Sequence, residues 1–230
     1  MIERRRDYGK KAPSKDAHKM YIVSEGSATE PNYFGFFKEL SSNLEIITIP
    51  SDDGRTDPVK LKQQAEMLFL GDKPKYIPDF LQGDTIWFVI DTDTWEEEGK
   101  IHFLRSFCLE QNEEVAQNPH LERRYSAWNI AQSNPCFEIW LYYHLYEQKP
   151  KNTDVEACAS FKEYVDQLFS GGFNSGKDPV RIADAIRNSE MNYICQDGTL
   201  GRYCTDVYLL GKEIYKFVER DVIRLRGKLS

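Results

Sequence analysis

Three acidic side chains follow two short apolar segments of this sequence. Glu25 comes directly after residues 20–24, Met-Tyr-Ile-Val-Ser, and Asp91 and Asp93 follow residues 86–90, Ile-Trp-Phe-Val-Ile. An apolar run of this length is typical of a buried strand in a parallel sheet. Carboxylate oxygens are the preferred ligands of hard divalent cations such as Mg²⁺ and Mn²⁺. The pattern therefore predicts a site for one or two such ions, which could serve in the hydrolysis of phosphodiester bonds.

Two further acids could reach the same edge of the sheet. Glu30 lies one short turn after Glu25, and Glu138 lies in the first turn of an apolar segment that is expected to be a buried helix. A buried carboxylate needs a metal ion or a hydrogen-bond partner. Ordinary alternatives stay open: a helix-terminal charge for Glu30, a structural network for Glu138, and an Asx turn for the Asp-x-Asp pair. His144 is expected to be a satisfied core histidine.

Strands and helices are expected to alternate through the first 150 residues. The strands are predicted at residues 20–24, 44–49, 85–90 and 126–132, and the helices at 29–40, 59–70, 100–114 and 134–146. Thr29 can cap the first of these helices. This alternation is typical of a parallel sheet with covering helices, and such sheets bind ligands beyond the carboxyl ends of their strands.

The chain divides into three expected parts. Residues 1–19 form a basic arm, residues 20–150 an α/β domain, and residues 151–230 a helical C-terminal region that packs on that domain. The helical patterns of the last part lie near residues 155–169, 179–188 and 205–226. We find no strand pattern there, so the sheet is expected to end before residue 151.

Composition excludes several classes of protein. A net charge of −7 argues against a generally basic nucleic-acid coat. The sequence contains no run of about 18 apolar residues, so no membrane span is expected. The charged N-terminus lacks the apolar centre of a signal peptide, which favours a cytoplasmic protein. Five scattered cysteines without a Cys-x-x-Cys pair predict neither a disulfide framework nor a structural zinc site.

Positive charge is concentrated in the N-terminal arm. A basic arm of this kind can follow a phosphate backbone, although it can also be only a solvated tail. Arg123 and Arg124, just before the fourth expected strand, could assist. The residues expected to contact nucleic acid are Arg4, Arg5, Arg6, Lys10 and Lys11.

The residues around these acids resemble the RloB family, whose core is a TOPRIM domain. The resemblance rests on residues 22–34, with Glu25-Gly26 and Thr29-Glu30-Pro31, and on residues 89–93 and 133–141, with a weaker match at 205–208. It implies a TOPRIM-like, that is Rossmann-like, α/β fold with a mostly parallel four-stranded sheet. It also implies that the first Glu and the two Asp of the Asp-x-Asp pair bind Mg²⁺ or Mn²⁺.

The resemblance further implies a metal-dependent endonuclease that cuts RNA such as tRNA, or DNA, as an effector of anti-phage defence. An AAA-type ATPase partner would control it. Glu25 would then be a metal ligand or general acid/base, with Glu30 and Glu138 as secondary ligands or orienting groups. Two alternatives stay open: a non-catalytic TOPRIM-like subunit that only regulates an ATPase complex, and a primase-like nucleotidyl transferase. The sequence contains no zinc ribbon or further polymerase element for the latter.

Overall fold

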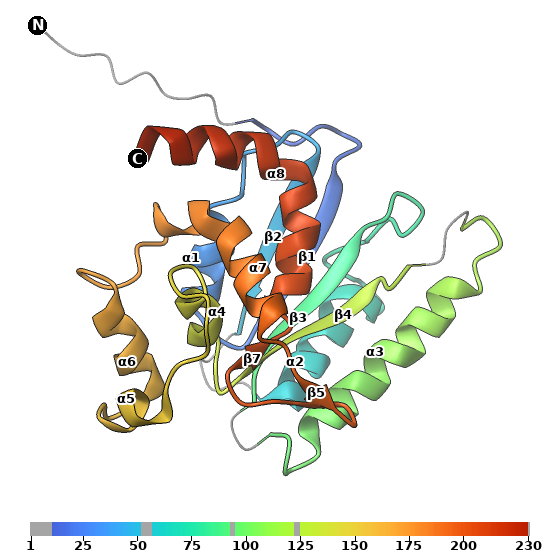
Figure 1. The fold of residues 1–230 in the computed structure, drawn as a ribbon. Helices are drawn as coiled ribbons and strands as arrows, with labels where there is room; N and C mark the ends of the chain where they lie inside the picture. The colour runs from blue at the N-terminus through green and yellow to red at the C-terminus, as the bar shows by residue number, and fades with distance from the viewer. Residues whose placement is uncertain (1–10, 52–56, 93–94, 122–124, 230) are drawn as a thin grey trace, which may run out of the picture.

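The computed structural model of the protein describes residues 11–51, 57–92, 95–121 and 125–229. Their centre is a five-stranded sheet in the order β2-β1-β3-β4-β7 (Figure 1). The strands are β1 (His18–Ser24), β2 (Leu44–Pro50), β3 (Thr85–Asp91), β4 (Trp128–Asn134) and β7 (Cys204–Thr205). The first four are parallel and β7 is antiparallel to β4. Because β1 and β3 are neighbours, Glu25 and Asp91 leave the sheet at the same edge.

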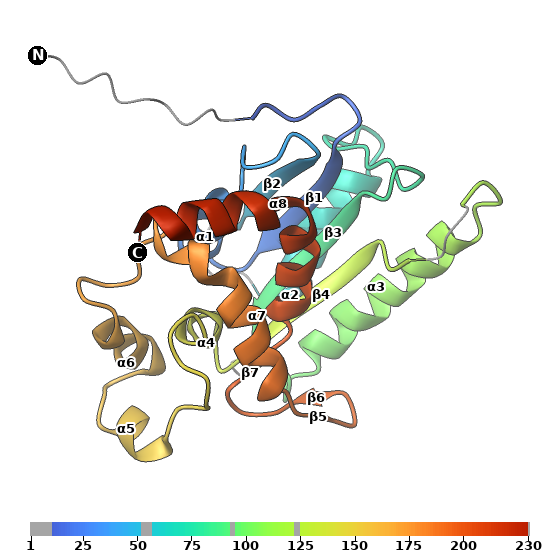
Figure 2. The ribbon, with the colours of Figure 1, turned by 45° about the horizontal axis from the view of Figure 1, so that its top comes forward.

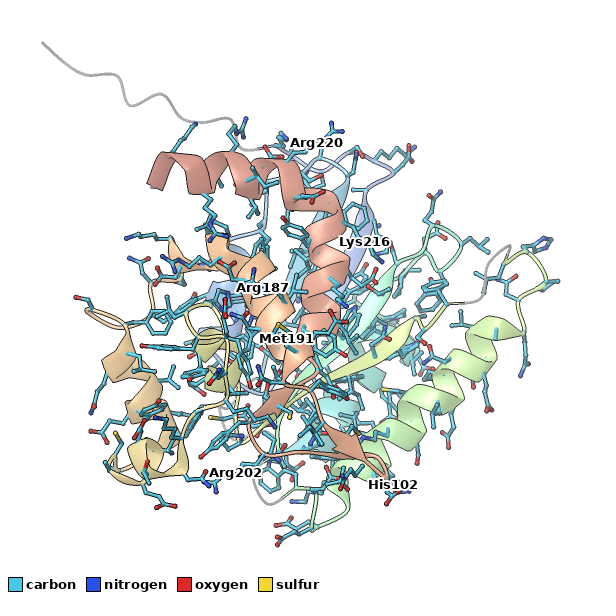
Figure 3. The ribbon with its side chains drawn as sticks, in the orientation of Figure 1. His102, Arg187, Met191, Arg202, Lys216 and Arg220 are labelled. Atoms are coloured by element: carbon cyan, nitrogen blue, oxygen red, sulfur yellow. The ribbon has the colours of Figure 1, made fainter. Side chains whose placement is uncertain are left out.

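Helices cover both faces of the sheet (Figure 2). One face carries α2 (Pro58–Ala65), which continues as the π-helical turn η1 (Glu66–Leu70), and α3 (Lys100–Ala116). The other face carries α1 (Thr29–Gly35), α4 (Glu138–Tyr142), α6 (Phe161–Leu168), α7 (Ile182–Met191) and α8 (Val207–Leu229). Figure 3 labels Arg187 and Met191 on α7 and Lys216 and Arg220 on α8, which mark this second layer.

Two hydrophobic cores result from this double cover. Successive side chains of a strand point to opposite faces. In β1, Met20 and Ile22 accordingly join the core under α1, α4 and α8, whereas Tyr21 and Val23 join the core under α2 and α3. All seven residues of β3 are buried, because this central strand is covered on both faces. The continuous apolar run that ends at Asp91 follows directly from that position.

Local signals explain where several helices begin. Asp57 caps α2, since its carboxylate accepts hydrogen bonds from the backbone N–H groups of Val59 and Lys60, and Pro58 occupies the first helical turn. Ser160 caps α6 by accepting from the backbone N–H of Glu163. Within the described residues, no helix combines the length and the apolar character needed to cross a membrane.

The sheet differs from the expected four strands. A fifth strand, β7, pairs Thr205 with Ser133 and Cys204 with Asn134, in a region predicted to be helical only. A small hairpin of β5 (Cys195–Gln196) and β6 (Thr199–Leu200) precedes it. Strands of two residues are too short to produce any alternation of apolar and polar side chains, so the sequence carried no pattern for them.

Two predicted helices are shorter than expected. The first ends at Gly35, and turns with hydrogen bonds to the third preceding residue continue the chain towards Leu40. Its N-cap is Ala28, which makes no side-chain cap, so the predicted capping by Thr29 was wrong. The helix expected over residues 134–146 spans only Glu138–Tyr142, because strand β4 extends to Asn134.

Two further short helices lie in the C-terminal region, α5 (Asn152–Glu156) before α6 and η2 (Asp178–Arg181) between α6 and α7. The short helix α5 contains no buried residue, and the 3₁₀ turn η2 leads directly into α7. The core contacts of the C-terminal region come instead from α6, α7 and α8, through residues such as Val165, Ile182 and Ile214. This packing brings the N-terminal end of α6 towards α4, which begins at Glu138.

Candidate active site

Glu25 and Asp91 meet at the carboxyl edge of the sheet. The register pairs Ser24 of β1 with Val89 of β3, so the two strands end almost level. The backbone N–H of Asp91 donates a hydrogen bond to Glu25 Oε2 at 3.2 Å, and the indole N–H of Trp95 donates to Glu25 Oε1 at 3.1 Å. Both oxygens of Glu25 are thereby oriented. Trp95 is half-buried, packs against the core under α2 and α3, and holds Glu25 in place.

Asp91 is buried at the end of β3. Its Oδ1 accepts a hydrogen bond from the backbone N–H of Phe137 at 2.8 Å, and its Oδ2 lies 3.7 Å from the ammonium of Lys162. Burial raises the pKa of Asp91 well above its usual range; Lys162 opposes this rise, and the nearby carboxylates of Glu30, Glu25 and Glu138 add to it. The surroundings therefore favour either a proton or a cation at this carboxyl group.

Glu30 and Glu138 are also close enough to act on Asp91 electrostatically. Each has a buried Oε2 that lacks a hydrogen-bond partner among the described residues. Burial, and secondarily the charge of Glu138, raises the pKa of Glu30. Glu30 folds back over Gly26, where a Cβ atom would overlap its carboxylate, so the glycine after Glu25 makes room for it. We call these four residues, Glu25, Glu30, Asp91 and Glu138, the carboxylate cluster.

One lysine of the C-terminal region reaches the carboxylate cluster. Lys162, near the start of α6, lies 3.7 Å from Asp91 Oδ2 and 3.9 Å from Glu138 Oε2. Burial alone would lower the pKa of Lys162, but the charges of Glu138 and Asp91 outweigh this effect, so the pKa is raised. The side chain therefore stays cationic. Sequence reasoning missed Lys162, because a single lysine on a surface helix carries no signal of its tertiary neighbours.

A second polar group of side chains lies beside the cluster, and it too was not predicted. Gln132 of β4 donates to Thr92 Oγ1 at 2.8 Å and to Glu96 Oε2 at 3.1 Å. Arg105 of α3 donates to Gln132 Oε1 at 2.5 Å and to Glu96 Oε1 at 3.1 Å. We call Thr92, Glu96, Arg105 and Gln132 the glutamine network. It fixes the residue that immediately follows Asp91.

The other predicted residues are not among the described members of the carboxylate cluster. Asp93, Arg4, Arg5, Arg6, Lys10, Arg123 and Arg124 are outside the described residues. Lys11 forms an ion pair with Asp221 of α8 at 2.8 Å, so the structure brings it to that helix and not to the carboxylate cluster. The weaker motif at Thr205-Asp206 ties the start of α8 to the sheet, since Thr205 Oγ1 lies 2.8 Å from Ser133 Oγ and the backbone N–H of Asp206 bonds to Gln132.

His144 is the core histidine that was expected. It is buried, and its Nδ1 lies 3.0 Å from the carbonyl oxygen of Trp140, which assigns the proton to Nδ1. Its Nε2 then accepts a hydrogen bond from the hydroxyl of Tyr33 at 3.1 Å. Burial lowers the pKa of His144 to about 4, so the ring is neutral at physiological pH. Both ring nitrogens are occupied by structural contacts.

The carboxylate cluster fits a hard divalent cation by its chemistry. All of its donor atoms are carboxylate oxygens, and two of them, Oε2 of Glu30 and Oε2 of Glu138, are buried without a hydrogen bond among the described residues. In that part of the chain, no group of three or more His, Cys, Asp and Glu side chains is already arranged to hold a metal ion. The third predicted ligand, Asp93, lies outside it.

Comparisons with known proteins identify the family. No curated protein and no solved structure matches the chain. A family model described as RloB-like protein matches residues 20–214, which include the carboxylate cluster, the glutamine network and Lys162. Because this match covers most of the 230 residues, the chain belongs to the RloB-like protein family.

Proposed function

We propose that the protein is a metal-dependent endonuclease of the TOPRIM type, which hydrolyses phosphodiester bonds in RNA such as tRNA, or in DNA. The observation that carries the proposal is the meeting of Glu25 and Asp91 at the ends of two adjacent parallel strands, with the Asp91 N–H bonded to Glu25. Two more carboxylates with unbonded buried oxygens lie beside them. Such a concentration of carboxylates, with Glu30 and Asp91 buried, is unfavourable unless a proton or a cation balances it.

The roles of the residues follow from their surroundings. Asp91 Oδ2 and Glu25 would hold a Mg²⁺ or Mn²⁺ ion, with Asp93 as the third predicted ligand. When bound, that ion would activate water and neutralise charge that develops on the phosphate. Glu30, whose pKa is raised by burial, is suited to accept a proton at Oε2. Lys162 is placed to contact a phosphate that approaches Asp91 and Glu138.

The biological setting is a separate part of the proposal. The resemblance to the RloB family supports a role as an effector of anti-phage defence that is controlled by an AAA-type ATPase partner. Lys162 is placed to contact a phosphate beside the carboxylate cluster, and the basic arm would supply further phosphate contacts. If the protein were a regulatory subunit without catalytic activity, the carboxylate cluster would still need a balancing cation.

A cleavage assay tests the activity. Labelled tRNA, single-stranded RNA and plasmid DNA are incubated with the purified protein in Mg²⁺, Mn²⁺ or EDTA, with and without the ATPase partner. The Asp91→Asn variant keeps the Oδ1 acceptor for the Phe137 N–H, and we expect it to lose metal-dependent cleavage. Asp72→Asn makes the same chemical change at an exposed loop position and is expected to cut normally.

The assay also decides between the alternatives. Cutting that requires a divalent metal, and that Asp91→Asn abolishes, supports the nuclease and identifies its polymer. Absence of cutting in every condition, together with absence of metal binding by calorimetry, would contradict the proposal and favour the regulatory subunit. Equal cutting by Asp91→Asn and the native protein would place the chemistry elsewhere.

A further inference from the structure

A cavity of about 540 Å³ opens beside the carboxylate cluster, between α1, α4, α6 and the loop that follows α6. Glu138 and Lys162 belong both to this cavity and to the surroundings of Asp91, so the two are continuous. A larger hollow of about 850 Å³ lies at the other end of the sheet, around Thr85, Trp87 and Lys216. It contains no member of the carboxylate cluster, and its size alone does not connect it with the chemistry.

The walls of the smaller cavity differ between floor and rim. The floor is apolar and consists of Leu141, Val165 and the ring of Phe173. The rest of the lining is polar: Thr29, Asn32 and Ser175 offer hydroxyl and amide groups, and the carboxylates of Glu138, Glu163 and Asp166 lie there with Lys162. The Phe173 ring is itself held in place, because it packs against Phe169 and His144 with ring centroids 5.1 and 5.5 Å apart. A rigid apolar floor below a few polar groups is typical of a pocket for a small flat ligand.

A nucleobase has this chemistry. Its faces are apolar and stack on aromatic or aliphatic side chains, and its edges carry hydrogen-bond donors and acceptors. The volume lies within the range of about 300–1,000 Å³ that is common for pockets of small ligands. Asn32 is exposed at the rim and offers both an amide donor and an amide acceptor to a base edge.

Lys162 connects the pocket with the place of cleavage. Its side chain is 62% exposed, so the ammonium can contact a ligand while it remains near Asp91 and Glu138. A phosphate bound at Lys162 would lie next to the carboxylate cluster, and the nucleoside attached to that phosphate would lie over the cavity.

We propose that this cavity is a nucleoside pocket, which takes one unpaired base of a nucleic-acid strand while Lys162 contacts the adjoining phosphate. The inference rests on the proposed function, since it assigns the cavity to the substrate of that site. A base inside a duplex is stacked and paired, and must be turned out of the helix before it can enter a pocket. The pocket therefore selects single strands, loops and bulges over continuous duplexes.

Binding experiments test the pocket apart from cleavage. Fluorescence anisotropy measures the Kd of labelled 12-nucleotide RNA and DNA, each as a single strand and as a perfect duplex. Ca²⁺ is present to balance the carboxylates. The Ala28→Trp variant places an indole at the exposed rim and fills the cavity without changing a charged residue. Ser170→Trp makes a similar change at an exposed position that does not line the cavity. Thermal unfolding of both variants verifies that they are folded.

The native protein and Ser170→Trp are expected to bind a single strand at least about 10-fold more tightly than a duplex, an effect of the size that stacking of one base produces. Ala28→Trp is expected to lose most of this preference. The RNA and DNA strands distinguish the two sources of an unpaired nucleoside. Equal binding of single strands and duplexes, no binding of either, or an unchanged preference in folded Ala28→Trp would overturn the pocket. Cleavage without strand preference would contradict only this inference, and strand preference without cleavage only the proposed activity.

Discussion

Two polar groups lie on either side of the point where β3 ends, and they are organised in opposite ways. In the glutamine network, Gln132 forms hydrogen bonds with both Arg105 and Glu96. Thr92 donates a hydrogen bond from its hydroxyl to the carbonyl oxygen of Ser133 at 2.8 Å. One arginine balances one glutamate there. In the carboxylate cluster, three of the four acids, Asp91, Glu138 and Glu30, act electrostatically on one lysine, Lys162. Two buried oxygens there lack hydrogen bonds among the described residues.

The difference in hydrogen bonding and charge indicates separate roles for the glutamine network and the carboxylate cluster. A saturated buried network stabilises one arrangement of the backbone, and removal of one member leaves its partners unsatisfied. A group with surplus charge destabilises the folded protein until a proton or a cation arrives. The glutamine network therefore positions the end of β3, and the carboxylate cluster is available for a ligand. Variants of the two groups should separate stability from activity.

The largest expected effect belongs to Glu25. Glu25→Gln removes a charge from the carboxylate cluster, and we expect the cleavage rate to fall by about 10²–10³, the range found when a group that stabilises transition-state charge is removed. Trp95→Phe removes only the indole donor that orients Glu25, and a fall of about 10-fold is expected, as for other groups that orient a metal ligand. Single-turnover cleavage measures both. A larger loss in Trp95→Phe than in Glu25→Gln would contradict these roles.

The next effect concerns stability and belongs to the glutamine network. Gln132→Leu removes one hydrogen bond each from Arg105, Glu96 and Thr92, which should lower the free energy of unfolding by about 1–3 kcal/mol. For a chain of this length, each kcal/mol shifts Tm by about 2–4 °C. Thermal unfolding measures the loss, with Gln117→Leu as the exposed control. An unchanged Tm in Gln132→Leu would remove the contrast between the two groups.

The sequence was sufficient for part of this arrangement. The apolar runs before Glu25 and Asp91 are local signals, and they correctly predicted two parallel strands that bring these acids to one edge of the sheet. The position of Glu138 at the start of a helix was also readable, although the helix is shorter than expected.

The remainder depends on contacts between distant segments. Gln132 and Arg105 meet because α3 packs against β4. The sequence pattern of neither segment predicts this contact. Lys162 reaches Asp91 because Val165 and Phe169 anchor α6 in the core beside α4. The strand β7 is two residues long, and only its pairing with Ser133 and Asn134 identifies it. These features come from packing, which a single sequence does not specify locally.

A third prediction uses pH. Because burial and the neighbouring carboxylates raise the pKa of Asp91 in the folded protein, the native state holds this proton more tightly than the unfolded chain does. The stabilisation that comes from protonated Asp91 is therefore fully present below the ordinary carboxyl pKa. It is lost as the pH rises through the raised pKa of Asp91 in the folded protein. In metal-free protein at pH 7.5, Asp91→Asn should raise Tm by about 2–4 °C, and the gain should disappear in acid. A gain that persists at low pH would disprove the charge explanation.

The smallest expected effect belongs to Lys162, because its side chain is largely exposed and solvent screens its ion pairs. Lys162→Met keeps the aliphatic length but removes the only positive charge that the described residues place within ion-pair distance of Asp91 and Glu138. In metal-free protein near pH 7.5, Tm should fall by about 1–2 °C. The raised pKa of Lys162 means that this contribution is present at neutral pH and is lost only in strongly alkaline solution.

Protonation of the acids or addition of a cation should cancel that loss. At acid pH the carboxylates are neutral and no longer need Lys162, and saturating Mg²⁺ would replace its charge, so Lys162→Met and the native protein should then unfold at the same temperature. Lys177→Met, at an exposed position of the same region, should leave Tm unchanged under all conditions. Equal losses at neutral and acid pH would mean that Lys162 acts through packing. In that case the comparison between a saturated network and a cluster that needs positive charge would no longer hold.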